Sequence, residues 1–247
     1  MSTTSHKHDP NFEISPPVTG DPIKRACEIL ESVSYNRGLI YRCMAKFFTY
    51  PDLALLEILK NGELFLQFKQ MTAWLGDDQD ALLRICEQLQ SLPGISLDSL
   101  TKDYTRLFEI GVERISPRES SYRWKNVGVI TSSEADLQQI LNVIYNNSGV
   151  SCKTGMEDHI AVELEFLAFL CEQEALRWSS GYSEAARNLR SEQRSFADDH
   201  IACWLPEFCF SLQKRNRNSF YGQAAVLCDR WLDLDHGPGY TTLMVFE

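Results

Sequence analysis

The stretch from Glu157 to Arg177 reads EDHIAVELEFLAFLCEQEALR and decides the fold. Its apolar residues recur every three or four positions, which is the spacing of one face of an α-helix. The face that we expect to point into the core carries Ile160, Leu164, Leu167 and Cys171. The opposite, polar stripe carries Asp158, Glu165 and Glu172. The segment therefore predicts a long amphipathic helix over 157–178.

The same helical spacing extends over most of the chain, whereas the alternating pattern of a strand is scarce. Pro51 and the pair Pro93-Gly94 interrupt the spacing and separate helices. We therefore predict an all-α fold, a helical bundle. The expected helices lie at 23–34, 36–49, 52–70, 78–91, 97–110, 132–147, 157–178, 182–214 and 217–233.

Two segments differ from this helical pattern. Residues 1–22 are rich in Ser, Thr, His and Pro, a composition that predicts a disordered tail. Residues 111–131 contain Gly111, Pro117 and Gly128, and predict a long loop that acts as a hinge. The hinge would join an N-terminal helical unit, 23–110, to a C-terminal helical unit, 132–247.

The charge and hydropathy of the chain restrict its partners and its location. Asp and Glu number 34 against 24 Lys and Arg, which gives a net charge of −10. This balance disfavours nucleic acid and anionic lipid as main partners. The densest apolar run, 166–171, is far shorter than the roughly 20 residues of a membrane span, and the N-terminus has no apolar signal region. We expect a cytoplasmic protein without membrane insertion, whose eight cysteines are reduced and mostly buried.

Two histidines fall on otherwise apolar helix faces, where a polar group needs a partner. His159 and Glu163 are four residues apart, so their side chains can meet on the predicted helix. A structural His–Glu pair and a pair that faces a cleft both fit this spacing. Phe196, His200 and Trp204 are also spaced by four and lie along one side of the helix predicted at 182–214. His200 fits either a satisfied core residue or a ligand.

These positions leave open a helical enzyme whose metal ion is bound by His159, Glu163 and His200. However, the chain contains no Glu-x-x-His, no His-Glu-x-x-His, no phosphate-binding Gly-rich loop and no Gly-x-Ser-x-Gly element. None of its cysteines forms a Cys-x-x-Cys pair. The missing signatures favour a binding protein, and we predict no catalytic residues, no metal and no cofactor.

Three segments resemble the TorD/DmsD/NarJ family of redox-enzyme maturation chaperones. The first, 104–122, contains YTRLF and PRESSY, similar to the family element Y-x-x-L-F…P-x-E-S-x-Y. The second, DHIAVELEF at 158–166, is similar to D-H-I-x-x-E-L-x-F. The third is Phe196 with His200, Ile201 and Trp204, similar to F-x-x-x-H-L-x-x-W. One departure is Gly155-Met156, which stands where many members have Glu-Pro.

The resemblance implies a TorD-like bundle of two helical units, found as a monomer or as a dimer that exchanges them. It implies a chaperone that binds the apo-form of a molybdopterin oxidoreductase of the dimethyl-sulfoxide-reductase type, its twin-arginine leader, or both, and delays export until the cofactor is inserted. A NarJ-like chaperone of a subunit that is not exported is the alternative. Asp158 and His159 inherit the leader-binding role.

A leader with a positive end and an apolar stretch needs carboxylates beside an aromatic-lined groove. Residues 157–174 contain six acidic residues and no Lys or Arg. Aromatic residues of the matched segments could form the groove walls. The residues that we expect to contact the leader or the client are Asp158, His159, Glu163, Tyr104, Phe108, Tyr122, Trp124, His200 and Trp204.

Overall fold

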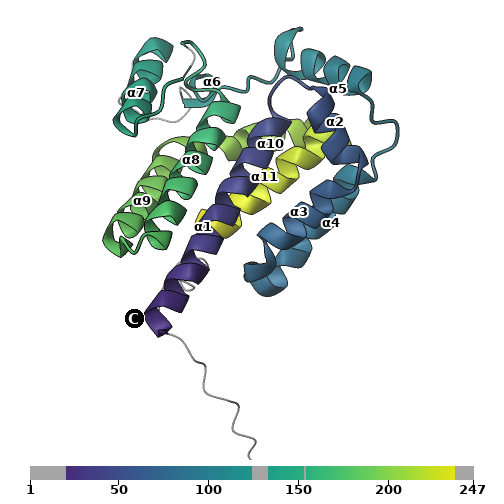
Figure 1. Ribbon diagram of the computed structural model, residues 1–247. Coiled ribbons are helices and arrows are strands. Elements are labelled where there is room, and N and C mark those ends of the chain that lie inside the picture. Colours follow the sequence, from purple (N-terminus) through teal and green to yellow (C-terminus); the bar gives the residue numbers. More distant parts are fainter. Residues whose placement is uncertain (1–20, 124–132, 153, 237–247) are drawn as a thin grey trace, which may run out of the picture.

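The computed structural model describes residues 21–123, 133–152 and 154–236, and every secondary structure element in these ranges is a helix (Figure 1). The predicted all-α fold is therefore confirmed. The N-terminal half contains α1 Pro22–Phe47, α2 Leu53–Lys60, α3 Glu63–Met71, η1 Ala73–Asp78, α4 Gln79–Gln90, α5 Leu97–Tyr104, η2 Thr105–Glu109 and α6 Ser120–Arg123. The C-terminal half contains α7 Glu134–Asn147, α8 Ile160–Ser179, α9 Ser183–Phe196, η3 Ala197–Ile201, α10 Ala202–Asn216 and α11 Phe220–His236.

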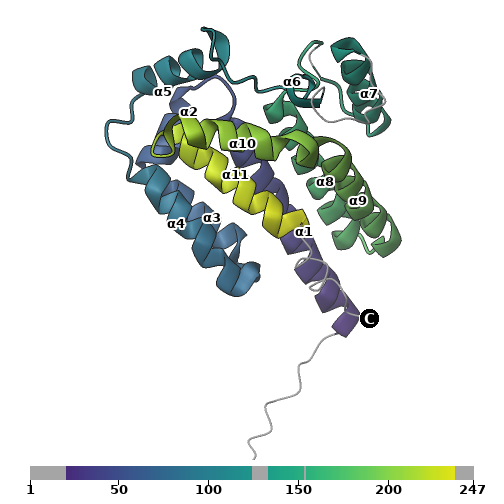
Figure 2. The same ribbon diagram turned by 180° about the vertical axis from the view of Figure 1, so that it is seen from behind.

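Helix α1 lies at the centre of the molecule, between the α8–α9 pair and the α3–α4 pair (Figure 1). Viewed from behind, α10 and α11 cover it (Figure 2). Gly38 brings α1 close to α8, because a Cβ atom at this position would lie 3.1 Å from the carbonyl oxygen of Ala168 and 3.3 Å from the Cβ of Cys171. A larger side chain at position 38 would push the two helices apart.

The region of the long central helix was predicted as two helices, at 23–34 and 36–49, and the division falls next to a polar break formed by Asn36, Arg37 and Gly38. The structure shows one continuous helix, started by Pro22 and capped by the Asp21 side chain, which accepts a hydrogen bond from the Ile23 amide. Arg37 and Gly38 are both buried within it. The polar break therefore marks an internal contact surface of α1.

Three other predicted helices differ from their expected form in the structure. The helix expected at 52–70 is divided into α2 and α3 at Gly62, whose φ of 72° lies in the left-handed region that favours glycine. The helix expected at 182–214 continues through α9 and α10, but η3 between them is a turn of π-helix. The helix expected from 157 begins only at Ile160.

The two predicted helical units share one apolar core in the described part of the chain. Helix α1 packs along α8, and α4 packs on α11, so each unit contacts the other. Of the predicted hinge loop, residues 111–123 are described and end in α6, while 124–131 lie outside the described residues. Nearly all of the predicted tail, 1–20, also lies outside them. The division at a hinge stays a prediction.

None of the described helices is both long and apolar enough to cross a lipid bilayer.

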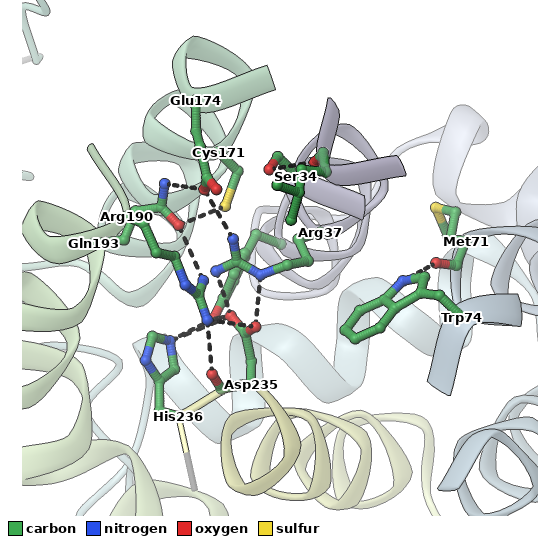
Figure 3. A network of polar contacts seen from close by, with 12 residues as sticks. Ser34, Arg37, Met71, Trp74, Cys171, Glu174, Arg190, Gln193, Asp235 and His236 are labelled. Carbon is green, nitrogen blue, oxygen red and sulfur yellow. Dashed lines mark hydrogen bonds and ion pairs between the residues drawn. The ribbon is translucent and has the colours of Figure 1, made fainter. Parts of the chain in front are cut away.

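A buried ionic network, missed in the sequence, ties α1 to α8, α9 and α11 (Figure 3). Arg37 is completely buried and binds Asp235 through two hydrogen bonds, Nε to Oδ1 at 2.6 Å and Nη2 to Oδ2 at 2.8 Å. Its Nη1 lies 3.2 Å from Oε2 of Glu174. We call this group the Arg37 network; its members are Arg37, Tyr41, Glu174, Arg190, Gln193 and Asp235.

The outer members of the Arg37 network add further donors to Asp235 and Glu174. The Tyr41 hydroxyl donates to Oδ2 of Asp235 at 2.5 Å, and Arg190 donates to the Asp235 backbone oxygen at 3.1 Å. Gln193 donates to Oε2 of Glu174 at 2.9 Å. Because burial removes the hydration of these charges, such partners are what makes the ion pairs tolerable inside the bundle.

Candidate functional site

The first turn of α8 is where the sequence placed the centre of the site. His159 is the N-cap of this helix, with φ −84° and ψ 136°, and its Nδ1 accepts a hydrogen bond from the Ala161 amide at 3.2 Å. It is therefore not helical, and the rule that side chains four apart meet does not apply to it. The expected His159–Glu163 pair is wrong, because each of the two side chains bonds to another group.

Residues 116–123 run across the start of α8 and are held there by backbone hydrogen bonds; we call them the strap. The Ile160 amide donates to the Pro117 carbonyl, and the Glu119 amide donates to the Asp158 carbonyl, both at 2.9 Å. A single antiparallel bridge pairs Arg118 with His159. The strap is the last described segment before residue 124, so these bonds anchor the C-terminal end of the N-terminal half.

Asp158 fastens the strap by its side chain. Its carboxylate lies 2.8 Å from Nη1 of Arg118 and accepts the Ser120 hydroxyl at 2.6 Å and the Ser120 amide at 3.4 Å. The polar stripe predicted from the helical wheel suggested an exposed residue, but Asp158 is fully buried. The difference follows from the later helix start, because the wheel position of a residue outside the helix has no meaning.

Glu119 of the strap is a site residue that the sequence analysis did not select, although it lies within the PRESSY match. Its carboxylate accepts from Nδ1 of His200 at 3.1 Å and pairs with Nε of Arg123 at 2.8 Å. Glu119 is fully buried and His200 nearly so. The predicted place of His200 on a buried helix face is confirmed, and its partner comes from 81 residues away in sequence.

Glu163 is a further fully buried acidic residue of the site. Its Oε2 accepts from Nε1 of Trp204 at 3.0 Å, and its Oε1 is buried without a donor. Burial raises the pKa of Glu163 well above its usual value, and the neighbouring Glu119 carboxylate raises it further, while the Trp204 donor opposes the shift. The raised pKa favours the protonated form of Glu163.

His159 experiences the opposite shift. Burial lowers its pKa to about 4, the Arg118 guanidinium adds to the effect, and the Asp158 carboxylate opposes it. The imidazole is therefore neutral near pH 7, and its unprotonated Nδ1 is free to cap the helix.

The π-helical turn η3 supplies the other wall of the site. A π-turn shifts the backbone hydrogen bonds by one residue and leaves carbonyl groups to be satisfied from outside the helix. The Asp199 carbonyl accepts from Nη2 of Arg123, and the Asp198 carbonyl accepts from the Cys203 thiol at 3.2 Å. Arg123 thus joins the strap to η3 as well as to Glu119.

Aromatic rings fill the space behind these polar groups. Tyr122 stacks on Trp204 with ring centroids 5.4 Å apart, and both rings contact Phe208. Phe208 in turn stacks on Phe108, which packs edge-on against Tyr104. The predicted aromatic residues therefore form one continuous layer, except for Trp124, which lies outside the described residues.

We call the polar part of this site the strap cluster; it consists of Arg118, Glu119, Ser120, Arg123, Asp158, Glu163, His200 and Trp204. The eight predicted site residues that are described are all at least 92% buried. They pack and bond to one another instead of lining an open groove. The arrangement can fix the position of the strap and of the loop that follows it. Their contact with a leader stays a prediction.

The acidic stretch 157–174 offers less free charge than its sequence suggests. Glu157, Asp158, Glu163 and Glu174 are buried. Glu165 and Glu172 flank Arg42 of α1, with N–O distances of 3.5 and 2.7 Å. The structure thus shows every acid of this stretch either buried or paired, which the sequence pattern did not indicate.

A metal site built on His159, Glu163 and His200 finds no support in the geometry. His159 caps α8, whereas Glu163 and His200 bond to Trp204 and Glu119. Over the described ranges, no group of three or more His, Cys, Asp or Glu side chains is arranged to hold a metal ion.

Comparison with known proteins places this arrangement in a family. Residues 74–210, more than half of the chain, match the sequence profile of the family described as the nitrate reductase delta subunit. The chain belongs to this family. The match covers the strap, the start of α8 and η3, and it confirms the predicted kinship with the TorD/DmsD/NarJ group.

Curated members of the group give further matches. A perchlorate reductase assembly chaperone protein from Dechloromonas aromatica is 25% identical over 81% of this chain and 88% of its own length. A selenate reductase assembly chaperone protein from Thauera selenatis is 29% identical over 68% of this chain and 72% of its own. A chlorate reductase assembly chaperone protein from Ideonella dechloratans is 30% identical over 58% and 72%. No solved structure matches.

Proposed function

We propose that this protein is a cytoplasmic assembly chaperone of a molybdopterin-containing reductase and has no catalytic activity of its own. The observation that carries the proposal is the agreement of three relatives, all named as reductase assembly chaperones, with the family match over 74–210. The ligand is the apo-form of the catalytic subunit, its twin-arginine leader, or both.

The geometry supports two different roles at the site, one for buried residues that position the strap and one for exposed residues that contact the client. Asp158 and Glu163 are buried and bonded within the protein, so they act on a client through the strap that they position. Arg118 connects the cluster to solvent, since 28% of its side chain is exposed. We infer that the exposed side of the strap contacts the client, and that the strap cluster keeps that surface in shape.

The experiment that tests chaperone function is assembly of the client. A molybdopterin-containing catalytic subunit from the same organism is expressed with and without this chain, and the molybdenum content of the purified subunit is measured. We expect substantially more bound molybdenum when the chaperone is present. Equal content in the two preparations would contradict the proposal.

The role of the strap is tested by leader binding. A fluorescent peptide of the client's N-terminal segment is titrated with the wild type, with Ser120→Ala and with Arg118→Gln. Each change removes one side-chain bond between the strap and Asp158 and should weaken peptide binding. Arg42→Gln, on the exposed α1–α8 surface, should not. Unchanged affinity in folded strap variants would remove the strap from the binding surface.

A second candidate is a chaperone for a subunit that is never exported, and the family match to nitrate reductase delta subunits favours it specifically. The same titration decides between the two, with a peptide in which both leader arginines are replaced by glutamine. Lost affinity supports twin-arginine recognition, and retained affinity supports the second candidate.

A further inference from the structure

A short loop after η2 holds two apolar side chains in solvent. Ile110 is 67% exposed and Val112 is completely exposed, with Gly111 between them at a φ of 115°. Transfer of an exposed Ile or Val side chain from water to an apolar surface is favourable. Two such side chains on adjoining positions therefore form an energetically significant contact surface if a partner covers them.

This loop is held in place by hydrogen bonds on both sides. The Ile110 amide donates to the Thr105 carbonyl at 2.9 Å, and the Ile115 amide donates to the Leu107 carbonyl at 2.7 Å. Arg215 of α10 holds Glu113 twice, through its carboxylate at 2.5 Å and its backbone oxygen at 2.7 Å. Because the conformation is fixed in advance, a partner would lose little free energy in ordering it.

A cavity of about 290 Å³ opens beside the two apolar side chains. Its walls are Arg106, Ile110, Gly111, Val112, Glu113 and Arg215. The loop lies over α10, which Figure 2 shows crossing the back of the molecule. Its size suits one or two side chains of a partner.

The charge around this cavity is opposite to that of the whole chain. Arg106 is paired with Asp103, and Arg215 with Glu113. Three further exposed cations stand next to them in sequence and form no ion pair with any described residue: Arg114, Lys214 and Arg217. With Glu109 also counted, the segments 103–114 and 214–217 carry five cations and three acidic residues, an excess of two positive charges in a protein of net charge −10.

We propose that this surface is a docking site for an acidic segment of a partner protein that also carries apolar side chains. We call it the loop surface; it consists of Arg106, Ile110–Arg114 and Lys214–Arg217. Charge complementarity selects the acidic segment, and Ile110, Val112 and the cavity provide the apolar anchor. That the client subunit carries this segment rests on the proposed function.

The proposal is tested with two designed peptides and the full-length chain. One is a helical peptide of about 16 residues, long enough to form a helix when bound, made of Glu, Leu and Ala; the other has Lys in place of Glu. Binding is measured by fluorescence anisotropy. The net charge of −10 by itself favours the Lys peptide, so preferred binding of the Glu peptide would be specific evidence for the loop surface.

The double variant Ile110→Ser/Val112→Ser locates the binding. It should reduce affinity for the Glu peptide at least about tenfold, which corresponds to about 1.4 kcal/mol, and leave the Lys peptide unaffected. Leu66→Ser is the control, because Leu66 is also an exposed apolar residue, at 59%, but lies on α3. Equal binding of the Glu peptide by wild type and double variant, or no binding of it at all, would overturn the proposal.

Binding experiments with the client distinguish the role of the loop surface from the chaperone function. The double variant should still bind the client's N-terminal peptide but lose affinity for the whole catalytic subunit. Unchanged affinity for the whole subunit would remove the client from the loop surface and leave the chaperone function intact. An absence of molybdenum insertion with the wild type would instead contradict the chaperone function, while the peptide result still decides the loop surface.

Discussion

Two buried polar networks hold this bundle together, and they differ in how their charges balance. The Arg37 network contains two guanidinium groups, Arg37 and Arg190, and two carboxylates, Glu174 and Asp235. The strap cluster also contains two guanidinium groups, Arg118 and Arg123, but three carboxyl groups. The strap cluster therefore has one carboxyl group more than it has guanidinium groups, and the raised pKa of Glu163 favours the protonated form of that acid.

The networks also differ in their distance from solvent. Arg37 and both of its carboxylate partners are completely enclosed, while Arg118 of the strap cluster is partly exposed. A closed and balanced network resists change and contributes to the stability of the bundle. The partly exposed Arg118 gives the strap cluster a connection to solvent that the Arg37 network lacks, and this agrees with the proposed role of the strap in client binding.

The largest expected effect comes from breaking the closed network. Arg37→Met leaves Asp235 and Glu174 buried without their shared cation, and should lower the free energy of unfolding by about 3–5 kcal/mol. Arg42→Met is the control, because Arg42 bridges Glu165 and Glu172 at the surface and should cost less than about 1 kcal/mol. Urea denaturation measures the free energy of unfolding of both variants. Similar losses would show that the buried Arg37 network stabilises the protein no more than the surface ion pairs of Arg42.

Removing Asp158 should cost less than removing Arg37, because Arg118 can turn into solvent when its partner is lost. Asp158→Ala leaves the Ser120 hydroxyl and amide without their acceptor, and we expect about 2 kcal/mol of destabilisation. The same urea series measures it. A loss as large as that of Arg37→Met would show that the strap cluster is as closed as the Arg37 network.

The raised pKa of Glu163 is tested by Glu163→Gln, because glutamine has the shape of the protonated acid but does not ionise. Since the folded-state pKa is raised, the stabilisation is complete below the unfolded value of about 4.3 and is lost as pH rises towards the folded value. The wild type should therefore lose stability relative to the variant, by at most about 1.4 kcal/mol per pH unit. The free energies of unfolding of both proteins are measured at pH 5, 6, 7 and 8. A constant difference between them would exclude a raised pKa of Glu163.

The smallest effect is expected at His159. Its lowered pKa, about 4, means that its contribution is present above the unfolded value of about 6.5 and is lost as pH falls from there towards about 4. His159→Ala should cost about 1 kcal/mol at pH 7 through loss of the helix cap, and His159→Asn should restore it. The Asn variant should also lose less stability between pH 6.5 and 4, which thermal melts at several pH values would show.

Local periodicity predicted the helical fold and part of the site. The apolar spacing around Leu164 and the spacing of Phe196, His200 and Trp204 identified buried helix faces correctly, because burial in a helix is a property of a single face. The first residue of α8 was misplaced by three positions. That error alone produced a His159–Glu163 pair that does not form and an exposed Asp158 that is buried.

The remaining features depend on contacts between distant parts of the chain. Glu119 meets His200 across 81 residues and Arg37 meets Glu174 across 137. No periodicity within one helix contains these pairs, so neither Glu119 nor Arg37 was predicted as part of a buried network. The fold class could thus be predicted from the sequence, while the partners that hold its charges could not.

The separation of Arg37 from Asp235 has a consequence during synthesis of the chain. Asp235 lies 198 residues after Arg37, and a ribosome needs about 10–40 s to add that many residues at about 5–20 per second. Throughout this interval the guanidinium at the centre of α1 has no carboxylate from α11 to accept it. The ion pair between α1 and α11 can therefore form only after α11 has left the ribosome, so α1 waits for its buried partner throughout the synthesis of the helices between them.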